Sequence, residues 1–125
     1  MSKTAIVTDK APAAIGPYSA ATQVGNTVYV SGQLPADPAT GAFPEGIAAQ
    51  TRQSLMNLKA ILEAAGMTMN DVVKTTVLLS DISNFGEMNK VYAEFFEAPF
   101  PARAAFQVAA LPKAALVEIE AIAAK

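Results

Sequence analysis

The chain has 125 residues, 52% of them apolar, and carries a net charge of −2 with a pI near 5.0. This length predicts one domain, residues 1–125, whose core needs no disulfide or metal to support it. The lack of cysteine and histidine excludes thiol nucleophiles, Ser-His-Asp triads and the usual zinc sites, and the seven scattered lysines form no basic patch for nucleic acid or an anionic membrane.

The amino-terminal segment begins with a short β-prone run, residues 4–8, and continues into a loop. It lacks the long apolar stretch of a signal peptide, and no part of the chain approaches the ~18 apolar residues of a membrane span, so we expect a cytoplasmic protein. In Gly16-Pro17-Tyr18, glycine frees the backbone and proline then stiffens it. Tyr18 therefore either offers its hydroxyl to a ligand or is a half-buried structural tyrosine.

Two short strands are predicted at residues 20–24 and 27–31, joined by a hairpin turn at Gly25-Asn26. The second strand runs into Ser31-Gly32, where a glycine permits another group to approach the backbone closely. No glycine of the chain belongs to a phosphate-binding motif, because neither the G-x-G-x-x-G nor the P-loop spacing occurs.

A helix over residues 46–65 follows from the spacing of its apolar side chains, with Gly66 as its stop and Arg52 as a solvated charge. Residues 71–80 form the most strongly predicted strand. Their nearly continuous apolar character predicts a central position with burial on both faces of the sheet.

A second helix is expected over residues 84–97, with an apolar stripe formed by Phe85, Met88, Tyr92, Phe95 and Phe96. Asn84 with Glu87 resembles a capping box at its start, and Pro99 prevents its continuation. Asn89 lies off the apolar stripe of this helix, which is typical of an exposed residue without a function.

The segment after these prolines carries Arg103, one of only two arginines in the chain, in a predicted strand over 102–110. Short alanine neighbours leave space around a guanidinium that cannot lose its proton. One interpretation is a fork of N–H donors that binds a carboxylate at the floor of a cleft. The other is a structural arginine that pairs with Glu118 or Glu120, or simply reaches solvent.

The last predicted strand, residues 116–122, alternates apolar and acidic side chains. Glu118 and Glu120 share one face of it, opposite Val117 and Ile119. These carboxylates could be rim charges, partners of Arg103, or a group that activates water, and their spacing does not distinguish the three roles.

The element order predicts an α+β fold, in which two helices pack on one face of a mixed β-sheet. No element remains to cover the opposite face of the sheet. We therefore expect the protein to form an oligomer.

Four segments resemble the reactive-intermediate deaminase family, RidA/YjgF. They read APAAIGPYS at 11–19, VSGQLP at 30–35, PARAAFQVAALPK at 101–113 and VEIEAIA at 117–123. The similarity runs through nearly the whole chain, and the combination of the PAR and EIE segments is specific to this family.

The resemblance implies a chorismate-mutase-like fold and a homotrimer with clefts between subunits. It implies hydrolysis of 2-aminoacrylate, 2-iminopropanoate and 2-iminobutanoate, which pyridoxal-phosphate-dependent dehydratases release, to 2-keto acids and ammonia, without a cofactor or metal in the deaminase itself. Arg103 would bind the substrate carboxylate and Glu118 would position the attacking water. The matching positions that would line the pocket are Tyr18, assigned a catalytic role, and the substrate-binding Ser31, Gly32 and Asn89.

One position departs from the family pattern: many members have a cysteine where this chain has Ala105. Thiol chemistry is therefore excluded here, and the effect on substrate range is open. The competing interpretation is a non-enzymatic module that binds small metabolites or acts as a chaperone. Ribonuclease activity, also linked to the family, is disfavoured by the acidic pI and the lack of histidine, and chorismate mutase activity by the small number of arginines.

Overall fold

The computed structural model describes residues 2–125, which form six strands and two α-helices with three short 3-10 helices between them. The strands are Thr4–Ile6 (β1), Ala21–Val24 (β2), Thr27–Gln33 (β3), Val72–Leu79 (β4), Ala102–Gln107 (β5) and Val117–Ala124 (β6). The helices are Ile47–Ala64 (α1) and Phe85–Tyr92 (α2), and the 3-10 helices are Met69–Asp71 (η1), Ile82–Asn84 (η2) and Pro112–Ala114 (η3).

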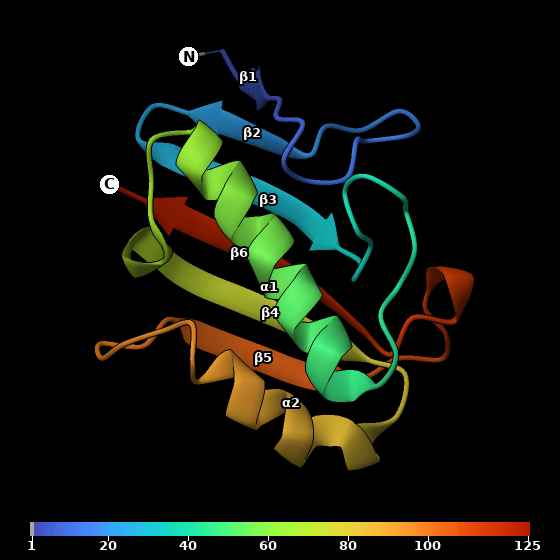
Figure 1. Ribbon diagram of the computed structural model, residues 1–125. Helices are drawn as coiled ribbons and strands as arrows, with labels where there is room; N and C mark the ends of the chain where they lie inside the picture. The colour runs from blue at the N-terminus through green and yellow to red at the C-terminus, as the bar shows by residue number, and fades with distance from the viewer. Residues whose placement is uncertain (1) are drawn as a thin grey trace.

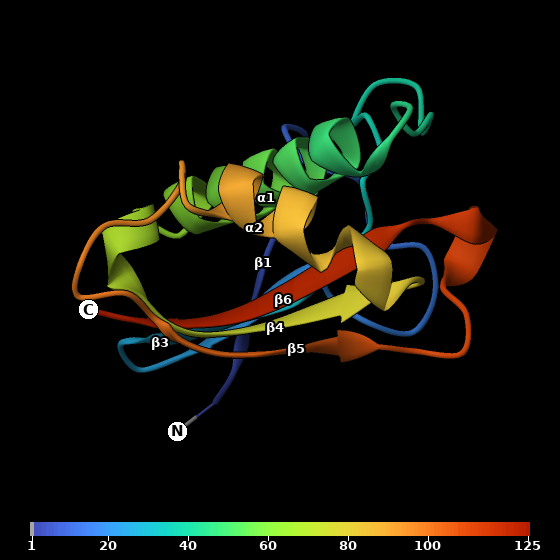
Figure 2. The same cartoon turned by 90° about the horizontal axis from the view of Figure 1, so that it is seen from below.

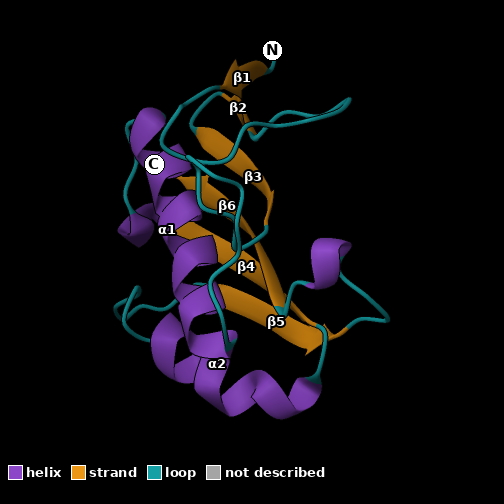
Figure 3. Ribbon diagram, turned by 45° about the vertical axis from the view of Figure 1, so that its right-hand side comes forward, coloured by secondary structure: helices purple, strands orange, loops and turns teal. Residues whose placement is uncertain are grey.

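All six strands belong to one sheet in the order β1-β2-β3-β6-β4-β5. Only β4 and β5 run parallel; the other neighbours are antiparallel, so the sheet is mixed. α1 crosses the sheet diagonally, and α2 lies beside α1 (Figure 1). Figure 2 and Figure 3 show both helices on the same face of the sheet. The expected α+β fold with two helices on one face is confirmed. Within residues 2–125, neither helix combines the length and the apolar character that crossing a bilayer requires.

The core lies between α1 and the sheet. Four apolar side chains of α1 are fully buried there, spaced along one face of the helix: Leu55, Leu58, Ile61 and Leu62. They pack with core residues of the central strands such as Val77 and Ile119. Burial of each such side chain contributes about 1.5–3 kcal/mol relative to exposure, so this contact fixes the position of the sheet beneath the helix.

Among residues 2–125, no helix covers the other face of the sheet, as Figure 2 shows. We call it the open face; it carries Tyr29, Lys74, Thr76, Leu78, Phe106, Glu118, Glu120 and Ile122. Tyr29 and Phe106 are 48% and 46% exposed. The prediction that residues 71–80 are buried on both faces is therefore wrong for the single chain, because only alternate residues of β4 contact the core.

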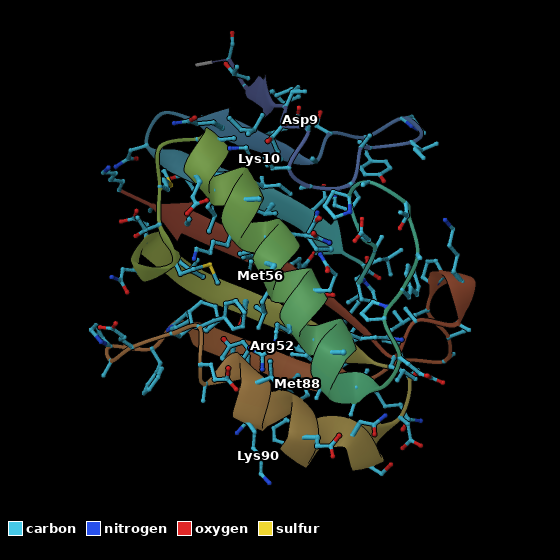
Figure 4. All side chains as sticks on the ribbon, viewed as in Figure 1. Asp9, Lys10, Arg52, Met56, Met88 and Lys90 are labelled. Carbon is cyan, nitrogen blue, oxygen red and sulfur yellow. The ribbon has the colours of Figure 1, made fainter. Side chains whose placement is uncertain are left out.

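The second helix differs most from its prediction. α2 ends at Tyr92 rather than at residue 97, and the chain then turns, with the Phe96 side chain still buried. The expected capping box is also absent: Asn84 makes no capping hydrogen bond, and the Asp81 side chain instead accepts one from the Ser83 N–H. After α2, the chain stays beside α1: Phe96 is buried in the core, and at the surface Glu94 pairs with Arg52 at 2.8 Å. Figure 4 shows Arg52 at the junction of the two helices.

The turn into β6 holds two non-glycine residues in the left-handed region, Lys113 at φ 55° and Ala114 at φ 57°. This conformation costs a non-glycine residue about 1–2 kcal/mol, and glycine avoids that cost. The greater conformational entropy of glycine in the unfolded chain offsets part of this gain. We expect Ala114→Gly to raise the free energy of unfolding by about 0.5–1 kcal/mol, measured by urea denaturation at fixed protein concentration.

The matched control is Ala60→Gly, in the middle of α1. There the same substitution is expected to lower the free energy of unfolding by about 1 kcal/mol, because glycine is a poor helix former. A loss of stability in both variants would contradict the strain assigned to Ala114.

Candidate active site

Arg103 lies on β5, the edge strand of the sheet. It pairs in register with Thr75 of β4, whose buried hydroxyl contacts α2, so its side chain projects from the face that carries the helices. The guanidinium Nη1 donates a hydrogen bond of 2.7 Å to the Asn89 Oδ1 of α2. The structure thus brings together two of the residues expected in the site, Arg103 and Asn89.

Two aromatic rings of α2 also contact this arginine. The guanidinium carbon lies 4.7 Å from the centre of the Tyr92 ring and 5.4 Å from that of Phe85. Cation–π contacts of this kind hold a cation without adding negative charge. Sequence reasoning placed both rings in the apolar stripe of the helix and assigned neither to the site.

The Arg103 guanidinium keeps its full charge. Among residues 2–125, no Asp or Glu carboxylate forms an ion pair with it, whereas the other arginine, Arg52, pairs with Glu94. A structural pair between Arg103 and Glu118 or Glu120 of the same chain is therefore wrong, whereas the exposure of Arg103 leaves it open to solvent or to a ligand. An exposed guanidinium that is held in place and not neutralised is suited to binding the carboxylate of a ligand.

A second cluster of expected site residues lies where β3 pairs with β6, with Glu118 on the open face. Gly32 stands at an irregularity in the pairing of β3 with β6, and any Cβ at this position would collide with the Glu118 carboxylate. The neighbouring Ser31 donates its hydroxyl to the Ser19 carbonyl at 2.6 Å, which ties the loop that carries Tyr18 to β3. Tyr18 is 56% exposed. Gly32 therefore provides the space in which this carboxylate sits.

The environment of Glu118 favours its neutral form. Partial burial, and secondarily the negative charge of Glu120, raise the pKa of the Glu118 carboxyl above its ordinary value. A carboxylate with a raised pKa is a better proton acceptor at neutral pH, as general-base catalysis requires. In the part of the chain that the structure describes, no three His, Cys, Asp or Glu side chains gather as metal ligands.

The two clusters lie on opposite faces of the sheet. Arg103 projects toward the helices, whereas Glu118 pairs with Leu78 and projects from the open face. One chain cannot therefore present both groups to the same small ligand. A site that contains both needs the Arg103 cluster of one chain and the Glu118 cluster of another.

The Endoribonuclease L-PSP family, which includes the RidA and YjgF proteins, matches residues 8–125. The chain belongs to this family. A curated RidA/YjgF relative from mouse (Mus musculus), named 2-iminobutanoate/2-iminopropanoate deaminase, is 56% identical over 119 residues, which cover 94% of this chain and 88% of the relative.

Solved structures of the RidA/YjgF family have the same fold. RidA from a Psychrobacter species is 56% identical, with a TM-score of 0.95 over 98% of this chain and 99% of that one. TdcF from E. coli, solved with bound serine, is 45% identical, with a TM-score of 0.94 over 98% of both chains.

Proposed function

We propose that this protein hydrolyses 2-imino acids, and the enamines in equilibrium with them, to 2-keto acids and ammonia. The observation that carries the proposal is the Arg103 guanidinium, which is held by α2 and lacks a carboxylate partner among residues 2–125. The name of the mouse relative, an imine deaminase, supports it, and so does the serine bound to TdcF, because serine carries the carboxylate that Arg103 would bind.

The C=N carbon of an imine is already electrophilic, so the enzyme has mainly to orient the substrate and the attacking water. Arg103 binds the substrate carboxylate through paired N–H donors and holds the adjacent C=N carbon in place. The Glu118 carboxylate accepts a hydrogen bond from water and takes its proton as the oxygen attacks that carbon. Starting from the protonated imine, this step gives a neutral carbinolamine, whose nitrogen then receives the proton back from Glu118. The C–N bond breaks and ammonia leaves, while Glu118 takes the hydroxyl proton and the hydroxyl oxygen becomes the carbonyl of the 2-keto acid. Tyr18, Ser31 and Gly32 line the side of the site that carries Glu118.

We propose that the site forms between subunits of a homotrimer. The opposite projection of Arg103 and Glu118 supports a site shared by two chains, and the apolar side chains on the open face support a surface that other copies cover. A cyclic trimer satisfies both, because each chain contributes Arg103 to one neighbour and Glu118 to the other. The trimer itself is expected from the family resemblance.

The test couples the protein to a threonine dehydratase, which releases 2-iminobutanoate, with semicarbazide present to trap the imine. We expect the protein to lower the amount of trapped adduct and to speed the appearance of the 2-keto acid. If the protein binds a 2-keto acid and yet leaves the adduct unchanged, a non-enzymatic binding module replaces this proposal.

The charge of Glu120 is expected to shift the acid limb of the pH profile to higher pH, in addition to the larger effect of burial. Glu118 acts in its ionised form, so kcat/KM falls as the pH drops through its pKa, which burial and Glu120 hold above the ordinary value for glutamate. Glu120→Gln removes the repulsion, which lowers this pKa and moves the acid limb to lower pH. Initial rates across the pH range, in a continuous 2-keto acid assay, check the shift; an unmoved limb would contradict the coupling.

A further inference from the structure

We propose that Phe85, Asn89 and Tyr92 of α2, with Thr75 behind Tyr92, form a clamp that positions the Arg103 guanidinium for a carboxylate without neutralising it. The proposal rests on the carboxylate-binding role proposed above for Arg103, and deepens it by naming the positioning residues. None of the four carries a carboxylate.

The clamp is built into one face of a single helix. Phe85, Asn89 and Tyr92 are four and three residues apart, a spacing that places side chains side by side on a helix surface. Phe85 and Tyr92 contact the guanidinium through their rings, at 5.4 and 4.7 Å from its central carbon, and Asn89 accepts the Nη1 hydrogen bond between them. Three neighbours on a rigid element therefore act on one planar cation.

The Tyr92 side chain is fixed in place by Thr75 and Phe96. Its hydroxyl hydrogen-bonds to the Thr75 hydroxyl at 2.8 Å, and both residues are buried. Its ring also lies 4.6 Å from that of Phe96, tilted by 36°. Because Thr75 is the residue of β4 in register with Arg103, the sheet that carries the arginine also holds the tyrosine ring that contacts it.

The neutrality of the clamp preserves the charge that binds the ligand. Asn89 is isosteric with aspartate, yet an aspartate here would form an ion pair with Arg103 and cancel its charge. The guanidinium has five N–H donors, and the Asn89 oxygen occupies one nitrogen, so donors remain for both oxygens of a carboxylate. The clamp also orders the long Arg103 side chain in the free protein. Ligand binding therefore does not have to offset the conformational entropy lost in ordering it.

The experiment uses the arginine Nε–Hε signals of the ¹⁵N-labelled protein, of which there are only two, and titration with 2-oxobutanoate as the carboxylate probe. Arg52→Lys leaves one signal and so assigns Arg103. We expect the Arg103 signal to be displaced upfield by the Tyr92 ring, and Phe85→Leu and Tyr92→Leu to broaden this signal or reduce its displacement. Each of these variants is expected to weaken binding of the probe about tenfold and to raise KM more than it lowers kcat.

Asn89→Asp separates charge from position. Asn89 is exposed, so this variant should fold, keep the Arg103 signal ordered and still bind the probe at least about tenfold more weakly. Tyr92→Leu and Phe85→Leu variants with the wild-type Arg103 signal and wild-type affinity would overturn the clamp. If the wild-type protein does not bind the probe at all, the proposed function fails, while the position and order of the Arg103 signal still decide whether the clamp exists.

Discussion

Arg103→Ala is expected to lower kcat/KM for imine hydrolysis by about a hundredfold or more. The variant loses a charge-assisted, two-point contact with the substrate carboxylate, worth about 3 kcal/mol in a partly desolvated site. The fold should survive, because Arg103 is exposed on an edge strand and stabilises no ion pair within residues 2–125. The measurement is the coupled dehydratase assay together with the molar mass and the unfolding midpoint of the variant.

The chain provides its own matched control. Arg52 is its only other arginine; it is exposed, and its guanidinium is already paired with the Glu94 carboxylate. Arg52→Ala is therefore expected to leave imine hydrolysis near the wild-type rate, since exposed ion pairs contribute little. Equal losses in Arg52→Ala and Arg103→Ala would mean that net charge, and not the Arg103 site, controls the rate.

Arg103→Lys refines the same test. Lysine keeps the positive charge, yet a single ammonium cannot give two parallel hydrogen bonds or lie flat against the rings of Phe85 and Tyr92. We expect it to recover only a small part of the activity that alanine loses. Full recovery would show that charge alone suffices and that the planar geometry is dispensable.

The elements that the sequence predicted well depend on local patterns. The helix at α1 follows from apolar spacing and a glycine stop, and the β2–β3 hairpin from Gly25-Asn26; both appear within two residues of their expected bounds. The end of α2 was mispredicted because Phe95 and Phe96 continue its apolar spacing, although the backbone has already turned. Tertiary burial of Phe96 satisfies the pattern without a helix.

The site was predictable only in part. Spacing alone left Arg103 between a ligand-binding and a structural role, and the family resemblance, not the pattern, favoured ligand binding. The contact with Asn89 needs the parallel pairing of β5 with β4, which no local signal encodes. Phe85 and Tyr92 were interpreted as core residues because aromatic side chains at helical spacing are usually buried. The signal that could have placed them in the site was their spacing from Asn89, four residues before it and three after it, which puts all three on one side of the helix.

A mixture of two inactive chains is expected to regain activity. Arg103→Ala and Glu118→Gln each remove one half of the site, and Glu118→Gln is expected to lower kcat by about a hundredfold because the amide cannot accept the proton of the attacking water. Co-expression with two different tags and purification on both yields only complexes that contain both chains. In such complexes some sites combine the intact Arg103 of one chain with the intact Glu118 of another.

The fraction of activity regained reports the assembly. A cyclic trimer of both chains has three directed interfaces, and only one pairs the two intact residues, so about a third of the wild-type activity returns. A two-fold dimer would return about a half. If both residues served a site within one chain, no mixing could restore it, and the complex would stay as inactive as its parents. Because the two side chains project from opposite faces of the same sheet, we expect activity to return. Because the family resemblance implies a trimer, we expect the regained fraction to be about a third.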